Sequence, residues 1–283
     1  MTPKLLERPE KAEPFLKWAG GKGQLLNDFV RLFPDKFRNY IEPFVGGGAV
    51  FFFLYSNGML DDKKITLIDS NGDLINAYKT LSDKNKLEDV IKALSNGKYL
   101  NNEKTFYKIR NEEPKSDSEK TARLIYLNKT CFNGLYRVNS KGKFNTPFGK
   151  YNNPLICDFV NLKAVSKSLE NVELINDDFT VVLEKADKGD FIYFDPPYQP
   201  INKTSNFTSY TKDSFNEKDQ ERLAKVFKIL DKRGCKLMLS NSDVKFIRGL
   251  YKGYRIEIVK AKRMINCKAA KRGAINELVI LNY

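Results

Sequence analysis

The segment Asp195-Pro196-Pro197-Tyr198 has the residue types for chemistry on an aromatic amine, and it directly follows a predicted strand, Phe191–Phe194. An exocyclic amine such as adenine N6 is a poor nucleophile because its lone pair is delocalised into the ring. The Asp195 carboxylate and the Pro196 carbonyl would each accept one N–H hydrogen and localise that lone pair, while Tyr198 would stack on the base. Prolines stiffen the turn and have no N–H group. The segment therefore favours group transfer to an aromatic amine over a loop that is merely stiffened.

A glycine turn, Gly46-Gly47-Gly48, follows a second predicted strand, Tyr40–Phe44. Without a Cβ, its backbone can turn sharply and pass close to a ligand. The third glycine of the dinucleotide fingerprint is missing, which disfavours a nicotinamide oxidoreductase. Asp69 ends the next predicted strand, Ile65–Ile68, and its carboxylate could accept hydrogen bonds from both ribose hydroxyls of a nucleoside. A helix N-cap is the alternative role for Asp69, but its distance from the glycine turn favours the ribose.

Two further clusters carry candidate binding residues. Phe15–Lys22 contains Trp18, which could form the wall of a pocket or simply belong to the core, and Lys22, which could approach the methionine carboxylate of a bound ligand. In Thr130–Tyr151, turn signals predict a hairpin. Its Arg137 could bridge guanine O6 and N7 in the major groove of DNA. The alternative is a surface hairpin that packs through its apolar residues, Phe132, Leu135 and Phe148.

The composition excludes several kinds of catalytic site. The 283 residues include no histidine, which excludes histidine bases, Ser-His-Asp triads and histidine-ligated metals. The four cysteines form no C-x-x-C pair, so we expect reduced thiols and no metal site. The formal net charge of +14 points to a polyanionic partner such as nucleic acid. Residues 76–160 carry 16 Lys and Arg against 9 Asp and Glu, and a second basic run spans 260–272; a solvated basic surface is the alternative for both.

Strands that alternate with helices predict an α/β fold with a parallel sheet. Further strand candidates are Val172–Ile175, Lys236–Leu239 and Glu277–Leu281, and Glu217–Leu230 has helical spacing. Residues 74–160 form a basic, largely helical insertion between two parts of the α/β domain, 1–73 and 161–283. No window is long and apolar enough for a membrane span, and residues 1–13 lack the apolar part of a signal peptide, so we expect a cytoplasmic protein.

Several motifs, taken together, resemble those of the Dam-type (DpnM-like) adenine-N6 DNA methyltransferases of the alpha group. They agree in order and spacing from about Phe15 to the C-terminus: FLKWAGGK (15–22), EPFVGGGAVF (42–51), IDSN (68–71), NGLYR (133–137) and DPPY (195–198). The resemblance implies a Rossmann-like methyltransferase sheet that binds S-adenosyl-L-methionine, formed by residues 1–73 and 161–283. It also implies that residues 74–160 are a mainly helical DNA target-recognition domain with a β-hairpin.

The resemblance also assigns roles residue by residue. Cofactor contacts are implied for Trp18, Lys22, Phe44, Gly46, Gly48, Asp69, Asp178, Phe179 and Asp195. Catalytic roles are implied for Asp195, Pro196 and Tyr198, and DNA contacts for Lys17, Phe132, Asn133, Leu135, Arg137 and Pro147. The neighbouring Asp177 leaves the choice of Asp178 open. The segment Ser205–Tyr210 matches a loop that closes over DNA.

The function that follows is methylation of adenine N6 in double-stranded DNA that contains GATC. Basic residues would hold the phosphates, the hairpin would read the site, and the flipped adenine would be methylated by direct displacement. We expect a bacterial or phage protein at the nucleoid that works beside a restriction endonuclease. An RNA or protein methyltransferase with the same cofactor site, or a DNA-binding protein without catalysis, are the alternatives.

Overall fold

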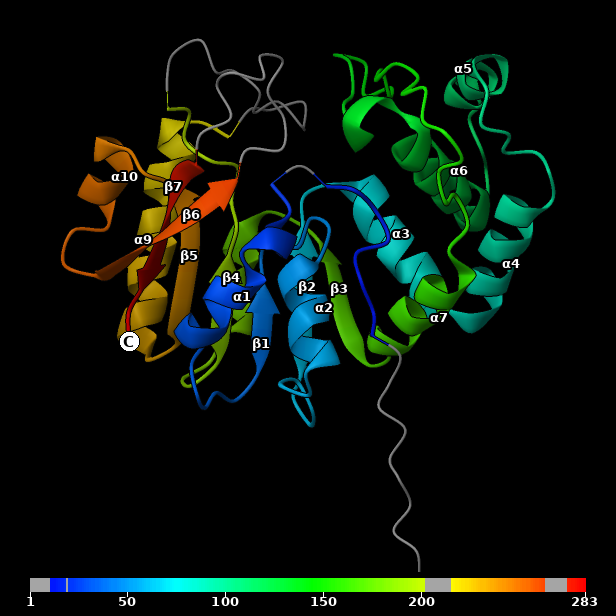
Figure 1. Ribbon diagram of the computed structural model, residues 1–283. Coiled ribbons are helices and arrows are strands. Elements are labelled where there is room, and N and C mark those ends of the chain that lie inside the picture. The colour runs from blue at the N-terminus through cyan, green and yellow to red at the C-terminus, as the bar shows by residue number, and fades with distance from the viewer. Residues whose placement is uncertain (1–10, 19, 202–214, 263–273) are drawn as a thin grey trace, which may run out of the picture.

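The computed structural model describes residues 11–18, 20–201, 215–262 and 274–283 (Figure 1). Over these residues, one seven-stranded sheet has the order β3-β2-β1-β4-β5-β7-β6. The pairs among β1 to β5 are parallel, and β7 is antiparallel to both of its neighbours. The strands are β1 (Tyr40–Glu42), β2 (Ile65–Asp69), β3 (Val172–Asn176), β4 (Phe191–Phe194), β5 (Lys236–Ser242), β6 (Arg255–Lys262) and β7 (Ala274–Leu281). The expected Rossmann-like α/β fold is confirmed.

Helices cover both faces of the sheet, which is why its central strand, β4, is buried and hydrophobic throughout. Alternate residues of a strand point to opposite faces. In β4, Phe191 and Tyr193 join one buried cluster while Ile192 and Phe194 join another. The first cluster includes residues of α1 (Leu26–Phe29), α2 (Ala49–Ser56) and α3 (Gly72–Ser82), and the second includes residues of α8 (Val182–Lys185), α9 (Glu217–Arg233) and α10 (Lys245–Leu250).

Helix α9 has capping residues at both ends. Asn216 and Asp219 form a capping box at its start. Gly234, with a φ of 85°, ends it in the left-handed conformation that glycine adopts without strain. The helix predicted over 217–230 is therefore correct and continues to Arg233. The described residues also form short 3-10 helices: η1 (Lys22–Gln24), η2 (Val30–Leu32), η3 (Phe132–Gly134) and η4 (Phe179–Val181).

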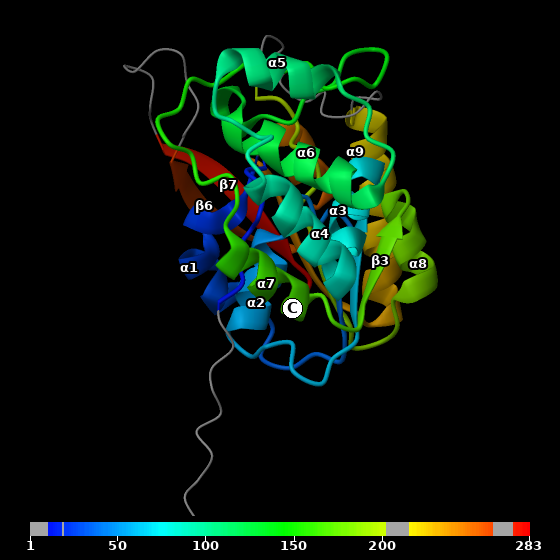
Figure 2. The same ribbon diagram turned by 90° about the vertical axis from the view of Figure 1, so that its right-hand side faces the viewer.

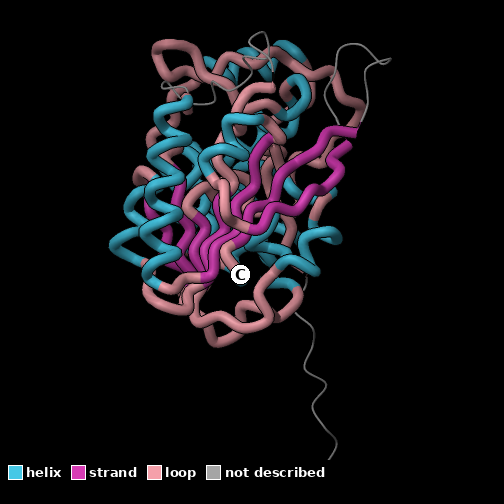
Figure 3. Tube along the Cα trace, turned by 90° about the vertical axis from the view of Figure 1, so that its left-hand side faces the viewer, coloured by secondary structure: helices cyan, strands magenta, loops and turns pink. Residues whose placement is uncertain are grey.

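Strands β6 and β7 lie side by side at one edge of the sheet (Figure 3), and their antiparallel pairing departs from the expected parallel sheet. Strand β7 pairs with β6 along its whole length, from Ala274 opposite Lys262 to Leu281 opposite Arg255. A returning strand of this kind must run antiparallel to its partner. The sequence prediction selected continuous apolar runs and so missed β6, in which polar and apolar residues alternate as is typical of a strand with one exposed face. Its Ile258 is 47% exposed at the sheet edge.

Helices α3 to α7 form a block beside β3 (Figure 2). The later members are α4 (Lys84–Ser95), α5 (Glu103–Asn111), α6 (Asp117–Thr130) and α7 (Phe159–Ser168). Their apolar side chains continue the same buried cluster that covers one face of the sheet. The proposed boundaries after residues 73 and 160 both fall in the first turn of a helix, α3 and α7. The division into two domains stays a proposal.

The segment 131–149, called here the recognition hairpin, follows α6. Two isolated antiparallel bridges, Cys131 to Phe148 and Val138 to Phe144, join its two sides. It packs on the side of the sheet where the parallel strands end, since Gly134 and Tyr136 contact the N-terminal segment Lys17–Trp18. Ser205–Tyr210 and most of the basic run 260–272 lie outside the described residues.

Candidate active site

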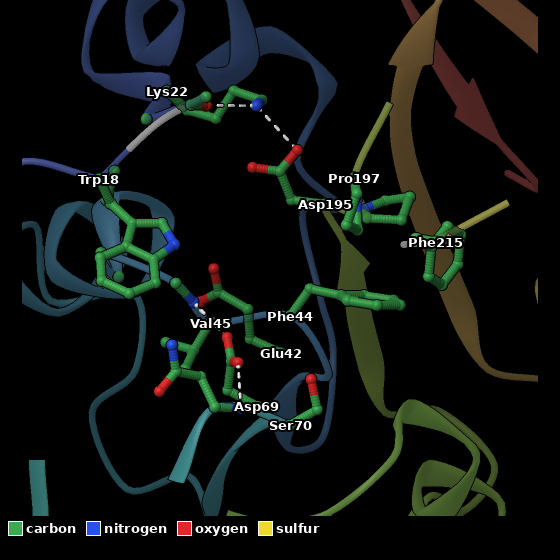
Figure 4. A pocket seen from close by; sticks show the side chains of 18 of the residues that line it. Trp18, Lys22, Glu42, Phe44, Val45, Asp69, Ser70, Asp195, Pro197 and Phe215 are labelled. Atoms are coloured by element: carbon green, nitrogen blue, oxygen red, sulfur yellow. Dashed lines mark hydrogen bonds and ion pairs between the residues drawn. The ribbon is translucent and has the colours of Figure 1, made fainter. Parts of the chain in front are cut away.

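A pocket of about 1150 Å³ opens at the carboxyl ends of β1, β2 and β4 (Figure 4). Strand order reverses between β1 and β4, and open α/β sheets bind ligands at such a switch point. Most of the residues predicted to bind cofactor or to act in catalysis line this one pocket: Trp18, Lys22, Phe44, Gly46, Gly48, Asp69, Asp178, Asp195, Pro196 and Tyr198. The structure therefore brings together segments that are up to 180 residues apart.

The glycine turn after β1 forms one wall of the pocket. Gly46 and Gly48 have φ values of 48° and 71°, in the left-handed region. A Cβ on Gly46 would lie 2.8 Å from the Trp18 ring, and one on Gly48 would lie 2.6 Å from the Tyr78 hydroxyl. That hydroxyl donates a hydrogen bond of 3.0 Å to the Gly46 carbonyl. Close packing and backbone conformation both require glycine here.

Asp69 is at the end of β2 and joins the glycine turn to the start of α3. Its carboxylate accepts hydrogen bonds from the Gly46 N–H (3.0 Å) and from the Asn71 N–H (2.9 Å). Burial raises its pKa, although these two N–H groups oppose the shift. Asn71, and not Asp69, caps α3, because its side chain accepts from the Leu74 N–H. The N-cap alternative for Asp69 is therefore wrong, and its carboxylate borders the pocket.

Aromatic rings form the opposite wall. Phe44 stacks on the buried Phe179 with ring centroids 5.2 Å apart, and Phe215 meets Phe44 edge to face at 5.7 Å. The Arg222 guanidinium lies 4.6 Å from the Phe179 ring centre and donates to Asp178 at 2.9 Å. Asp178 lines the pocket, whereas Asp177 is exposed and is not among its lining residues. Phe215 and Arg222 had no recognisable signal in the sequence.

The predicted catalytic carboxylate, Asp195, is paired with Lys22 from the N-terminal segment. The Lys22 Nζ lies 2.7 Å from Asp195 Oδ1, and Lys22 is 4% exposed. Burial raises the pKa of Asp195, and the Lys22 charge limits the rise. For Lys22, burial acts to lower the pKa, but the charges of Asp195 and Glu277 outweigh it and the net shift is upward. Lys22 thus contacts Asp195 directly, in the same pocket where a cofactor contact was expected for it.

Two further acidic residues, which the sequence analysis did not select, surround this ion pair. Glu277 on β7 accepts a hydrogen bond from the Tyr198 hydroxyl, and its carboxylate lies 3.8 Å from the Lys22 Nζ. Glu42 at the end of β1 is 2% exposed and accepts from the Tyr40 hydroxyl at 2.8 Å. Burial raises the pKa of both glutamates. The pocket therefore holds Asp195 in a densely charged and largely buried cluster.

A buried amide network fixes the loop that follows β4. Gln220 on α9 donates to the Pro197 carbonyl at 2.9 Å, and it accepts from Asn241 on β5 at 3.0 Å. Asn241 in turn accepts from the Gln199 N–H at 3.1 Å. Gln220 and Asn241 are fully buried. The Pro197 carbonyl is therefore engaged within the protein, and the neighbouring Pro196 lines the pocket.

The residues predicted to touch DNA lie outside this pocket, on or beside the recognition hairpin. Lys17, Asn133, Arg137 and Pro147 are exposed, Phe132 is 51% exposed, and Leu135 is partly buried. The Arg137 guanidinium donates to the Asn145 side chain (2.7 Å) and to the Asn145 carbonyl (3.2 Å). These side chains share one surface element, because the Lys17 side chain packs against Gly134.

The doubly wound sheet and the pocket at its switch point define a Rossmann-like methyltransferase. The chain matches the family of D12 class N6 adenine-specific DNA methyltransferases over residues 18–265. It therefore belongs to this family. The enzyme is an adenine-specific DNA methyltransferase, and S-adenosyl-L-methionine is its methyl donor. No group of three or more acidic or cysteine ligands in the described residues could hold a metal ion, and no helix there is long and apolar enough to span a membrane.

Relatives of known name resemble the chain over nearly its full length. The type II methyltransferase M.MjaIII of Methanocaldococcus jannaschii is 50% identical and is aligned over 96% of this chain and 100% of its own length. The type II methyltransferase M1.LlaDCHI of Lactococcus lactis subsp. cremoris is 40% identical, with 95% of each chain aligned. The DNA adenine methylase of Escherichia coli (strain K12) is 33% identical over 96% of each chain.

The residues of the pocket fit S-adenosylmethionine. A nucleoside needs acceptors for its ribose hydroxyls and an apolar surface for its base, and Asp69 with the Phe44 and Phe215 rings supplies both. Phe179, for which a cofactor contact was expected, is buried against Phe44 and is not among the residues that line the pocket. A cofactor that lies against the backbone needs a wall without side chains, which Gly46, Gly47 and Gly48 provide, since all three line the pocket.

Proposed function

We propose that this enzyme methylates adenine N6 in double-stranded DNA at GATC, after the target base has been flipped into the pocket. The observation that carries the proposal is that Asp69 and Asp195 border one pocket, so that a nucleoside cofactor and a substrate amine fit next to each other. The alpha-group motif order supports the placement of the DNA-reading residues between these two sites.

In this proposal Asp195 and Pro196 orient the amine. Lys22 holds Asp195 Oδ1, and the second carboxylate oxygen points into the open pocket (Figure 4). That oxygen and the Pro196 carbonyl accept the two N6 hydrogens, which localises the nitrogen lone pair. Bound S-adenosylmethionine supplies an electrophilic methyl carbon. Tyr198, whose hydroxyl is held by Glu277, offers its ring to the base. The Asp195 carboxylate is then the nearest base for the proton that the methylated amine releases.

The recognition hairpin is proposed to supply specificity, and the net charge of +14 to supply affinity. Arg137 would read a guanine, and Leu135 and Pro147 would touch neighbouring bases. Phe132 and Asn133, which are exposed beside the Cys131–Phe148 bridge and not at the 139–143 turn, would enter the duplex where the adenine leaves the stack, a step that costs a few kcal/mol. Phosphate contacts by lysines would make the affinity strongly dependent on salt.

The biological setting proposed here is the cytoplasm, where the enzyme acts on nucleoid DNA beside a restriction endonuclease. The name "type II methyltransferase", which two of the relatives carry, supports this setting.

The test is transfer of labelled methyl groups from S-adenosylmethionine to two DNA duplexes that differ only in GATC or GTTC. We expect labelling of the GATC duplex alone, and none by Asp195→Ala, which should still bind DNA. Equal labelling of both duplexes would contradict the proposed specificity for GATC. Labelling of RNA or protein but of neither duplex would contradict the proposal that DNA is the substrate. Substantial activity in Asp195→Ala would contradict the proposed catalytic role of Asp195.

A further inference from the structure

The wall of the cofactor pocket and the recognition hairpin are joined by direct contacts. Lys17 and Trp18 are consecutive residues whose side chains lie in different surroundings. Lys17 is exposed beside the hairpin, and Trp18 lines the pocket. The hairpin packs against both of them, although it lies more than 100 residues later in the sequence. The proposed chemistry at Asp195 does not require this contact.

Asn128, at the end of α6, makes the first link. Its side chain is fully buried, accepts a hydrogen bond from the Lys17 N–H at 2.7 Å and donates to the Lys17 carbonyl at 2.8 Å. It also donates to the Gly134 carbonyl at 3.0 Å. Gly134 has a φ of 63°, and a Cβ there would lie 2.6 Å from the Lys17 Cβ. One amide thus binds two backbone segments that are already in close contact.

Tyr136 makes the second link, and it lies between the proposed base contacts Leu135 and Arg137. Its ring stacks on Trp18 with centroids 5.3 Å apart and an interplanar angle of 26°. Its hydroxyl donates to Asp73 at 2.8 Å, in the first turn of α3. Tyr136 is 7% exposed and also lines the cofactor pocket. A single hairpin residue therefore touches both the Trp18 wall and the helix that follows Asp69.

We propose that Asn128 and Tyr136 are positioning residues that hold Trp18 and the recognition hairpin in one arrangement, so that cofactor and DNA bind with positive coupling. A ligand that orders Trp18 also orders Tyr136 and the base-reading side chains beside it. By thermodynamic linkage, DNA must then increase the affinity for cofactor by the same factor. This inference rests on the proposed function, because it takes the hairpin as the element that reads DNA.

The chain provides its own probe, since Trp18 is the only tryptophan. The full-length enzyme is titrated with S-adenosylhomocysteine while Trp18 fluorescence is followed, with and without a GATC duplex. The variants are Tyr136→Leu, Tyr136→Phe and Asn128→Ala. The matched control is Tyr99→Leu, because Tyr99 is equally buried in the helical block but packs on Tyr126.

Without DNA, we expect Tyr136→Leu to bind S-adenosylhomocysteine about two- to tenfold more weakly, since an aromatic pair is lost. The duplex should tighten binding to the wild type by about fivefold or more, a typical coupling between sites. This factor should fall towards one in Tyr136→Leu and Asn128→Ala. Tyr136→Phe keeps the ring and should retain most of the tightening by the duplex. Tyr99→Leu should match the wild type.

Unchanged affinity and unchanged tightening in Tyr136→Leu would overturn the inference, as would a wild type whose cofactor affinity does not respond to duplex. A Tyr136→Phe variant that behaves like Tyr136→Leu would overturn the role of the stack. Should Asn128→Ala fail to fold, the Tyr136→Leu and Tyr136→Phe variants still test whether cofactor and DNA binding are coupled. If the wild type responds equally to the GATC and GTTC duplexes, the proposed GATC specificity fails, while the titration without DNA still tests the Trp18–Tyr136 contact.

Discussion

Lys22 and Asp195 form an ion pair of 2.7 Å in which the lysine is almost completely buried. An ionised carboxylate accepts hydrogen bonds from an amine more strongly than a protonated carboxyl group does, and burial disfavours the ionised form. Lys22 counters this cost with a full positive charge, and it holds one carboxylate oxygen so that the other faces the pocket (Figure 4). Its main contribution to catalysis is thus proposed to be the charge state and orientation of Asp195.

Replacing Lys22 with methionine should move the acid limb of activity to higher pH. Burial raises the pKa of Asp195 and Lys22 lowers it, so loss of Lys22 lets the pKa rise further. Activity is present above this pKa and is lost as the pH falls through it, so the variant should lose activity at a higher pH than the wild type. The measurement is kcat against pH at saturating cofactor and DNA.

Lys22→Arg is the matched control, because it keeps the charge and should leave the acid limb close to that of the wild type. A Lys22→Met variant with reduced kcat but an unshifted limb would show that Lys22 does not set the ionisation of Asp195.

Glu42→Gln should stabilise the fold, and more so as the pH rises. Burial raises the pKa of Glu42 well above its usual value, the hydrogen bond from Tyr40 opposes the rise, and the charge of Asp195 adds to it. The folded state therefore keeps a proton that the unfolded chain releases. The stability that this group contributes is complete below the usual glutamate pKa and declines as the pH rises towards the folded value. Glutamine stays neutral and can still accept from Tyr40.

Thermal unfolding at several pH values measures this effect. The difference in Tm between Glu42→Gln and the wild type should grow from acid towards alkaline pH. The exposed Glu221 on α9 provides the control, and Glu221→Gln should show no such trend. A constant difference for Glu42→Gln would mean that its ionisation is not linked to folding.

The parts of the site that were predictable are those with local causes. The positive φ values of Gly46 and Gly48 favour glycine in the turn after β1, and the segment at Asp195 directly follows an apolar strand. Both signals are contained in a few consecutive residues. The strands β1 to β5 were likewise visible as short apolar runs bounded by turns.

The missed residues depend on contacts between distant elements. Glu277 reaches the pocket only because β7 inserts between β5 and β6, and nothing near it in the sequence indicates that pairing. Gln220 looks like an ordinary polar residue of an amphipathic helix, yet α9 turns it towards the Pro197 carbonyl. In the same way, only the structure shows that Asn71, and not Asp69, caps α3.

Gln220→Leu should lower kcat while cofactor affinity stays near that of the wild type. Leucine has a similar size but leaves the Pro197 carbonyl and the Asn241 amide without their partner, a cost of about 1–3 kcal/mol for each buried group. The loop that carries Asp195 then loses its anchor. The measurement combines kcat with the dissociation constant of S-adenosylhomocysteine.

Leu223→Ala is the matched control for Gln220→Leu. It removes a buried side chain from the same helix, at a cost of about 2–5 kcal/mol, but it faces the sheet instead of the loop. It should lower the Tm while kcat is kept. Equal losses of kcat in the two variants would reduce the role of Gln220 to general stability.

Arg137→Ala should relax sequence preference at one base pair of the site. The guanidinium is exposed and donates two hydrogen bonds to Asn145, so it is oriented before DNA arrives. Loss of a bidentate contact to guanine should cost about 1–3 kcal/mol of discrimination. Methylation is measured on duplexes that carry each single substitution of the site. Lys141→Ala, an exposed cation on the same hairpin, should weaken all duplexes alike and reduce the salt dependence. An Arg137→Ala profile that parallels that of Lys141→Ala at every position would make Arg137 a phosphate contact, and the specificity would then have to come from other residues of the hairpin.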